Sequence, residues 1–238
     1  MAQNSFIQNV DGVNRVQERY SHFLEGCGFS IEHREFPGRG RIVVAENRAA
    51  RETGRPIAIV GHADTVHPPD SVPHLLSPRE GRLYGPGAFD MKAGLVVIGL
   101  AVEAIRDAGL MDHLPLRIII NSAEENGTAE TKAFMARAAE HARAALVFEF
   151  GRAGGHIVTE RKGRCQGTFT VNGRSGHAGL AAGSGVNAIE AIGPLLTDAP
   201  AAARNPGEGT TFNWGTITGG TADNVIAAQV TASFEVRS

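Results

Sequence analysis

Apolar residues in the first two thirds of the chain alternate between a helical period and short continuous runs. Residues 12–27 carry Val13, Val16, Tyr20 and Phe23 at three- and four-residue spacing, which predicts an amphipathic helix. Two further helices are expected at 92–108 and 131–143, and short apolar strands at 41–45, 56–61, 116–120 and 144–148. This alternation of helices and strands indicates α/β layers.

The pattern changes after about residue 162. Three segments alternate apolar and polar side chains, one helix lies between them, and an Ala/Gly/Pro-rich exposed loop follows it: strands at 163–171, 210–216 and 225–236, the helix at 185–196 and the loop at 198–209. Alternation with period two predicts strands whose sheet has one solvated face. We therefore expect two domains, residues 1–162 and residues 163–238, the second a small α+β unit.

Composition and charge exclude several classes of protein. The chain has 23 Lys and Arg against 25 Asp and Glu, so it lacks the basic surplus of a nucleic-acid binder. Its longest apolar runs, such as 95–102, are far shorter than the roughly 20 residues that span a bilayer, and its first residues lack a signal-peptide pattern. The two cysteines, Cys27 and Cys165, are expected to be reduced thiols. We expect a cytoplasmic protein with no nucleic-acid or membrane partner.

His62 and Asp64 directly follow the apolar run at 56–61. A histidine can bind a metal through one ring nitrogen while a nearby carboxylate orients the ring. A loop histidine beside a turn aspartate is an equally good interpretation of these two residues taken alone.

Asp90 ends a tight loop of two glycines and a proline, residues 85–90, that precedes a predicted helix. The loop is not a phosphate cradle, because no Gly-Lys-Ser/Thr ending follows it. Asp90 is either a metal ligand or the N-cap of the following helix.

Three glutamates follow the other two central strands. Glu124 and Glu125 are adjacent carboxylates that repel each other unless they share a cation or a proton, although a solvated pair is the commoner explanation. Glu149 ends the run at 144–148, and a carboxylate among such apolar neighbours needs a metal or an arginine partner. Together with His62 and Asp90, these residues would meet at one edge of one sheet. A carboxylate-rich set with one imidazole suits a two-metal hydrolytic centre.

The ordered motifs resemble those of the co-catalytic zinc aminopeptidase/aminoacylase family, which includes glutamate carboxypeptidase, acetylornithine deacetylase and succinyl-diaminopimelate desuccinylase. The motifs that carry this resemblance lie at 61–67, 84–94, 124–125, 148–149, 174–179, 185–188 and 224–226. The resemblance covers essentially the whole chain and is greatest to the glutamate carboxypeptidase branch. It implies a zinc-exopeptidase-like catalytic domain with a mainly parallel central sheet, followed by a small α+β dimerisation, or lid, domain.

The resemblance also implies roles for individual residues. His62 and Glu149 would hold one zinc ion, Asp90 would bridge two, and Glu125 would bind the second. Glu124 would be the general base.

Three further roles follow from the same resemblance. Asp64 would orient the ring of His62. His177 would reach the active site of the partner subunit in a homodimer, and Asn224 would contact the carboxylate of the substrate.

The sequence departs from the family pattern at several positions. Family members continue beyond the equivalent of Ser238, and that segment supplies a histidine to the second zinc, so both domains and the second zinc site are expected to be incomplete here. The seven histidines other than His62 and His177 match no other ligand position of the family. Phe150 stands where proline is frequent, and Ala123 where aspartate is usual.

The sequence leaves two functions open. One is a zinc-dependent hydrolase that cleaves an amide or peptide bond to an amino acid through a water activated by two metals, acting on a small acyl-amino acid or peptide. The other is a non-catalytic homologue that serves as a dimerisation or binding module through residues 185–196 and the adjacent edge strand. A nucleotide-binding protein is disfavoured, because the G-x-G-x-x-G motif is absent.

Overall fold

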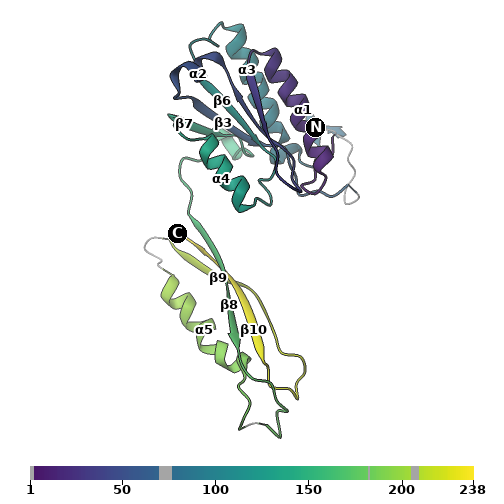
Figure 1. The fold of residues 1–238 in the computed structure, drawn as a ribbon, viewed down its shortest axis with the longest axis vertical. Helices are drawn as coiled ribbons and strands as arrows, with labels where there is room; N and C mark the ends of the chain where they lie inside the picture. Colours follow the sequence, from purple (N-terminus) through teal and green to yellow (C-terminus); the bar gives the residue numbers. More distant parts are fainter. Residues whose placement is uncertain (1–2, 70–76, 182, 205–208) are drawn as a thin grey trace. The chain divides into compact units, whose positions relative to one another are not determined.

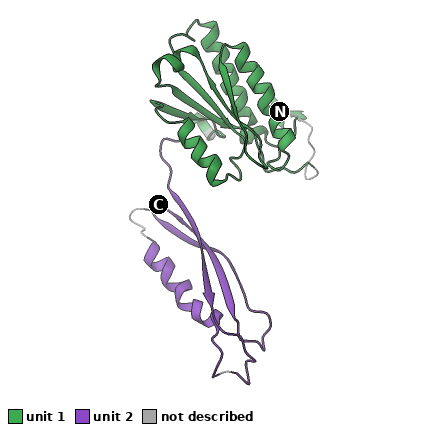
Figure 2. Ribbon diagram, viewed as in Figure 1, with its two compact units in different colours: residues 1–156 green, residues 157–238 purple. Residues whose placement is uncertain are grey.

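The computed structural model describes residues 3–69, 77–181, 183–204 and 209–238. The chain divides into two compact units, residues 1–156 and 157–238 (Figure 2), and each is described by itself. The assignment of residues 1–162 to a catalytic domain and 163–238 to a dimerisation domain stays a prediction. None of the described helices is both long and apolar enough to cross a membrane.

The first unit consists of a central sheet, a separate two-stranded hairpin and flanking helices (Figure 1). Its helical elements are α1 (Val10–Gly26), α2 (Arg48–Thr53), η1 (Ala88–Lys92), α3 (Ala93–Asp107), α4 (Ala129–Ala138) and η2 (Ala153–Gly155). Its strands are β1 (Ser30–Arg34), β2 (Ile42–Glu46), β3 (Ile57–His62), β4 (Ser77–Arg79), β5 (Arg82–Tyr84), β6 (Leu116–Asn121) and β7 (Ala144–Val147).

The central sheet has the strand order β1-β2-β6-β3-β7. β3 pairs in parallel with β6 on one side and with β7 on the other, as their three short continuous apolar runs predict. β1 and β2 add an antiparallel pair beyond β6, so the sheet is mixed. A short connection such as the one between β1 and β2 can join only antiparallel neighbours, whereas parallel strands need a longer crossover. The expected α/β fold is confirmed.

The core of the first unit holds the site-bearing strands in place. Val13 of α1 and Ile98 of α3 are fully buried in one cluster with Ile118 and Ile120 of β6. Gln17, also fully buried, donates hydrogen bonds from its side-chain amide to the carbonyls of Ile120 (2.9 Å) and Asn121 (3.2 Å). Helix α1 is therefore fixed to the carboxyl end of β6, just before the paired glutamates.

The second unit is a three-stranded antiparallel sheet with one helix. Its elements are β8 (Arg164–Asn172), α5 (Ala188–Ala203), β9 (Thr211–Gly219) and β10 (Gln229–Arg237), with the strand order β8-β10-β9. Ala188 and Ile192 of α5 pack against Val230 and Ala232 of β10. The indole N–H of Trp214 donates to the carbonyl of Leu196 at 3.1 Å. The unit is the small α+β fold that period-two alternation predicts.

The predicted loop at 198–209 is wrong over its first part, because α5 continues to Ala203. Pro194 and Pro200 lie inside this helix, and Pro200 is buried. Each proline lacks a backbone N–H donor, and the helix continues past both with its buried side packed on β10. Residues 205–208 lie outside the described part of the chain.

Candidate metal centre

Three parallel strands bring the candidate residues to one edge of the sheet. His62 is the last residue of β3 and is in register with Asn121, the last residue of β6. The backbone N–H of Phe148, just beyond β7, donates to the carbonyl of Val60 at 2.8 Å. The chain segments that follow β3, β6 and β7 therefore leave the sheet side by side, which is where open α/β sheets hold their ligands.

His62 is the common member of the cluster. Its ring is buried, and its Nε2 atom lies 3.2 Å from Oδ1 of Asp90 and 3.6 Å from Oε1 of Glu149. Its Nδ1 atom lies 3.0 Å from the backbone oxygen of Asp64 and 3.4 Å from Oδ1 of the same residue. Nε2 thus faces the carboxylates of Asp90 and Glu149, while Nδ1 faces Asp64.

Asp64 is fully buried and orders the segment that follows β6. Its carboxylate accepts hydrogen bonds from the backbone N–H groups of Glu124 (3.2 Å) and Glu125 (3.0 Å). Sequence reasoning gave Asp64 only the orientation of His62 and missed this second contact, because it joins residues about 60 positions apart. The same carboxylate therefore connects the histidine and both glutamates.

Two overlapping sets of side chains could each hold a metal ion. His62, Glu124 and Glu149 form one set, and His62, Asp90 and Glu125 form the other, each with ligand atoms within 4.8 Å of one another. The five candidate residues thus come together in the structure. Their separate roles as ligands, bridge and base stay predictions.

Burial and the neighbouring charges both shift the pKa values of the cluster. Burial lowers the pKa of His62, but hydrogen bonds and charge from Asp64 and Glu149 outweigh it and raise the pKa to about 11. Burial, followed by the charge of Asp90, raises the pKa of Glu125 to about 7. Burial also raises the pKa of Glu124. A divalent cation would neutralise these charges, and nitrogen and carboxylate oxygen are ligands that zinc accepts.

Lys92 is a charged residue next to this cluster that sequence reasoning did not select. Its side chain is only 4% exposed, and burial lowers its pKa to about 8 against the opposing charge of Asp64. A Cβ built on Gly87 would lie 3.1 Å from the ammonium nitrogen of Lys92. Its place in the motif at 84–94 was the only sequence signal for it.

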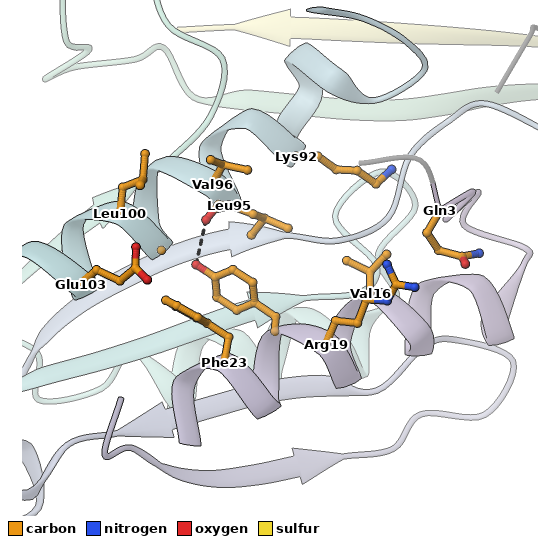
Figure 3. Close-up of a pocket in the computed structure, with 11 residues that line it drawn as sticks. Gln3, Val16, Arg19, Phe23, Lys92, Leu95, Val96, Leu100 and Glu103 are labelled. Carbon is orange, nitrogen blue, oxygen red and sulfur yellow. Dashed lines mark hydrogen bonds between the residues drawn. The ribbon is translucent and has the colours of Figure 1, made fainter. Parts of the chain in front are cut away.

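A cavity of about 320 Å³ lies between α1 and α3 (Figure 3). Its walls are mainly apolar, and the hydroxyl of Tyr20 donates to the carbonyl of Leu95 at 2.8 Å across it. Among the residues that line it, only Lys92 belongs to the motif at 84–94, which contains Asp90. The cavity therefore contains none of the candidate metal ligands.

The two candidate substrate-binding residues lie close together within the second unit. The backbone N–H of Ala178 donates to the carbonyl of Asn224 at 2.9 Å, and His177 forms an isolated bridge with Val225. Nδ1 of His177 accepts a hydrogen bond from the N–H of Gly179 at 3.2 Å. Both side chains are exposed, and their role toward a substrate stays a prediction.

Comparison with known proteins agrees with the fold and the residue pattern. Residues 159–238 match the peptidase dimerisation domain of the M20 peptidases. The chain is 32% identical over 243 residues to acetylornithine deacetylase of Myxococcus xanthus, covering 95% of this chain and 61% of the relative. It is 27% identical over 222 residues to carboxypeptidase G2 of Pseudomonas sp. strain RS-16, covering 90% of this chain and 52% of the relative.

Solved structures show the same fold. Aminopeptidase PepT of Bacillus cereus superposes with a TM-score of 0.77 at 23% identity, covering all of this chain and 64% of that one. The chain thus spans 52% to 64% of the length of the relatives named here. The resemblance inferred from the motifs is confirmed, and which branch is nearest stays a prediction. The chain is similar to M20 peptidases and deacylases over most of its length, and its residues 159–238 match their dimerisation domain.

Proposed function

We propose that the chain carries the zinc-binding part of a hydrolase that cleaves an amide or peptide bond to an amino acid. The observation that supports this most directly is the meeting of five candidate site residues at the carboxyl edge of β3, β6 and β7. They are His62, Asp90, Glu124, Glu125 and Glu149. The family's hydrolases give the reaction class, and the substrate is a small acyl-amino acid or peptide.

The candidate residues would have separate roles at the metal. His62 and Glu149 would hold one zinc ion, Asp90 would bridge, and Glu125 would hold the second. Zinc bound there would supply a water of lowered pKa and would polarise the carbonyl to be cleaved.

Glu124 then takes a proton from the attacking water as its oxygen bonds to the carbonyl carbon. It gives that proton to the nitrogen as the C–N bond breaks, so that a carboxylate and an amine leave. Asp64 keeps Glu124 in place through the backbone hydrogen bond at 3.2 Å.

The second unit would join two copies of the chain. The match to the peptidase dimerisation domain supports a homodimer, in which His177 and Asn224 would contact substrate. Both cysteines are free, Cys27 buried and Cys165 exposed, which supports a cytoplasmic location.

Replacement of Glu124 by glutamine tests the assignment of the base. We expect the Glu124→Gln chain to retain its zinc and to lose hydrolysis of acyl-amino acids by about 100-fold or more, because the amide cannot accept the proton. Glu18→Gln, an exposed change on α1, is the matched control and should leave the rate unchanged.

Hydrolysis that survives in Glu124→Gln would show that another group is the base. A zinc-loaded wild-type chain that cleaves no acyl-amino acid would favour the second candidate, a dimerisation module without catalysis. The match of residues 159–238 supports that candidate.

A further inference from the structure

The cavity between α1 and α3 resembles a small-molecule site in its size and its lining. Its volume of about 320 Å³ lies at the lower end of the range for such sites, and its walls are mainly apolar with a few charged groups (Figure 3). Both helices contribute apolar side chains, which are Val16, Tyr20 and Phe23 of α1 and Leu95, Val96 and Leu100 of α3. Val96 is 48% exposed and Leu100 is 59% exposed, so part of this apolar surface is open to a ligand.

Lys92 places a buried positive charge at one end of the cavity. Its side chain is only 4% exposed and lines the cavity wall. Among the described residues, its ammonium group makes no hydrogen bond and no ion pair, and the charge of Asp64 acts on it only from a greater distance. The carboxylate of Asp64 already accepts the backbone N–H groups of Glu124 and Glu125. Because a buried charge without a partner is costly, an anion in the cavity would supply the partner that the chain does not.

The charges along the cavity give an anionic ligand one direction. Arg19, an exposed residue of α1, and the amide of Gln3 lie toward the end where Lys92 lies (Figure 3). Glu103 lies toward the opposite end, near Leu100. An anionic group is therefore attracted to Lys92 and repelled by Glu103, and the apolar part of the same molecule would lie along the wall between them.

The length of the apolar wall indicates the length of the ligand. Lys92 and Leu100 differ by eight positions, which is about 12 Å along α3 at the helical rise of 1.5 Å per residue. An extended chain advances about 1.2 Å per bond, because a residue of three backbone bonds spans at most about 3.6 Å. A carboxylate with a tail of about eight carbons would therefore cover most of this distance.

We propose that the cavity between α1 and α3 binds a medium-chain fatty acid, with its carboxylate at Lys92 and its unbranched apolar tail toward Phe23 and Leu100. The cavity contains none of the candidate metal ligands, so this inference does not depend on the proposed function. The fatty acid would be a second ligand of the first unit and would take no part in hydrolysis.

Titration of octanoate into the purified chain by isothermal titration calorimetry tests the proposal. Octylamine has the same tail and a positive charge at neutral pH, so it is the matched ligand control. We expect octanoate to bind at least about 10-fold more tightly, because a hydrogen bond between charged groups provides a difference of this size. The affinity should be the same with and without a chelator, since the carboxylate would contact Lys92 and not a metal ion.

Substitutions then assign the binding to the cavity. Lys92→Met keeps the apolar stem but removes the ammonium group, and it should weaken octanoate binding about 10-fold or more. Gly99→Leu should weaken it to a similar extent by filling the cavity; a Cβ at this position would lie 3.5 Å from the ring of Phe23, an ordinary contact. Lys132→Met, at an exposed lysine of α4, and Gly193→Leu, at a glycine of α5 with open space beside it, are the matched controls and should bind octanoate as the wild type does.

Four results would overturn the proposal. They are no measurable binding of octanoate, equal binding of octanoate and octylamine, an affinity that a chelator abolishes, and wild-type affinity in Gly99→Leu. The last result decides the question even where Lys92→Met does not fold. Octanoate that binds only after dilution to monomers would instead assign the cavity to a contact between two copies of the chain, and would overturn the proposal as well.

Discussion

At the scale of single residues, most of the candidate site residues could be predicted because each follows a strand that is recognisable from its apolar run, whereas Asp90 ends a tight loop before a helix. His62, Glu124 and Glu149 need only a parallel arrangement of those strands to meet. The second contact of Asp64 and the burial of Lys92 could not be predicted, because both depend on how distant loops fold over one another. The stacking of Phe89 on Phe150 likewise joins segments that no local pattern connects.

Replacement of Asp64 by asparagine should weaken the centre without removing any ligand. Its carboxylate accepts two backbone hydrogen bonds and faces Nδ1 of His62, and an amide offers only one acceptor oxygen. We expect zinc affinity to fall about 10- to 100-fold, and the free energy of unfolding to fall by about 1–3 kcal/mol.

Zinc titration and urea denaturation measure these two changes. Asp107→Asn, at an exposed side chain on α3, should change neither beyond about 0.5 kcal/mol. An Asp64→Asn chain that binds zinc as tightly as the wild type would refute the positioning role.

Zinc binding should release protons in a pH-dependent number. In the metal-free chain Glu125 has a pKa of about 7 and His62 of about 11, so at pH 6 both carry a proton that must leave when zinc fills both sites. At pH 8 Glu125 is already ionised and only His62 remains protonated. Proton release should therefore fall from about two toward about one per chain between pH 6 and pH 8.

Calorimetry in buffers of different ionisation enthalpy counts these protons. The apparent zinc affinity should rise more steeply with pH below 7 than above it. A release that grows with pH over this interval would contradict the assignment of Glu125 to the metal.

At the scale of elements, apolar segments were predicted well and two polar ones were missed. β3, β6 and the helix α3 appear within a few residues of their expected positions. β1 and α2 were missed, because β1 is largely exposed and polar and α2 has only six residues, so neither carries a clear hydrophobic period. Helix α5 passes two prolines because its buried side packs on β10, a tertiary effect that local sequence does not show.

The attachment of α1 to β6 predicts that Gln17 is important for stability. Gln17→Met keeps the approximate volume but removes the amide that donates to the buried carbonyl of Ile120 and the partly buried carbonyl of Asn121. We expect the free energy of unfolding to fall by about 1–3 kcal/mol in urea denaturation. Gln8→Met, at an exposed position before α1, should stay within about 0.5 kcal/mol of the wild type; equal stability of the two variants would argue against the attachment.

At the scale of the whole molecule, the chain combines an α/β unit that bears the acidic cluster with an α+β unit that matches a dimerisation domain. The sequence predicted this combination, because the period of its hydrophobic positions differs between the two units. The hydrophobic period could not predict that the sheet is mixed, because the antiparallel strands β1 and β2 join it through tertiary pairing.

The zinc content of the purified chain tests the central claim, that these side chains form a metal centre. Elemental analysis after exchange into zinc-free buffer should find at least about one zinc ion per chain, and much less in His62→Ala. His113→Ala, at an exposed histidine, should retain the wild-type content. A wild-type chain with no more zinc than His62→Ala would contradict the account.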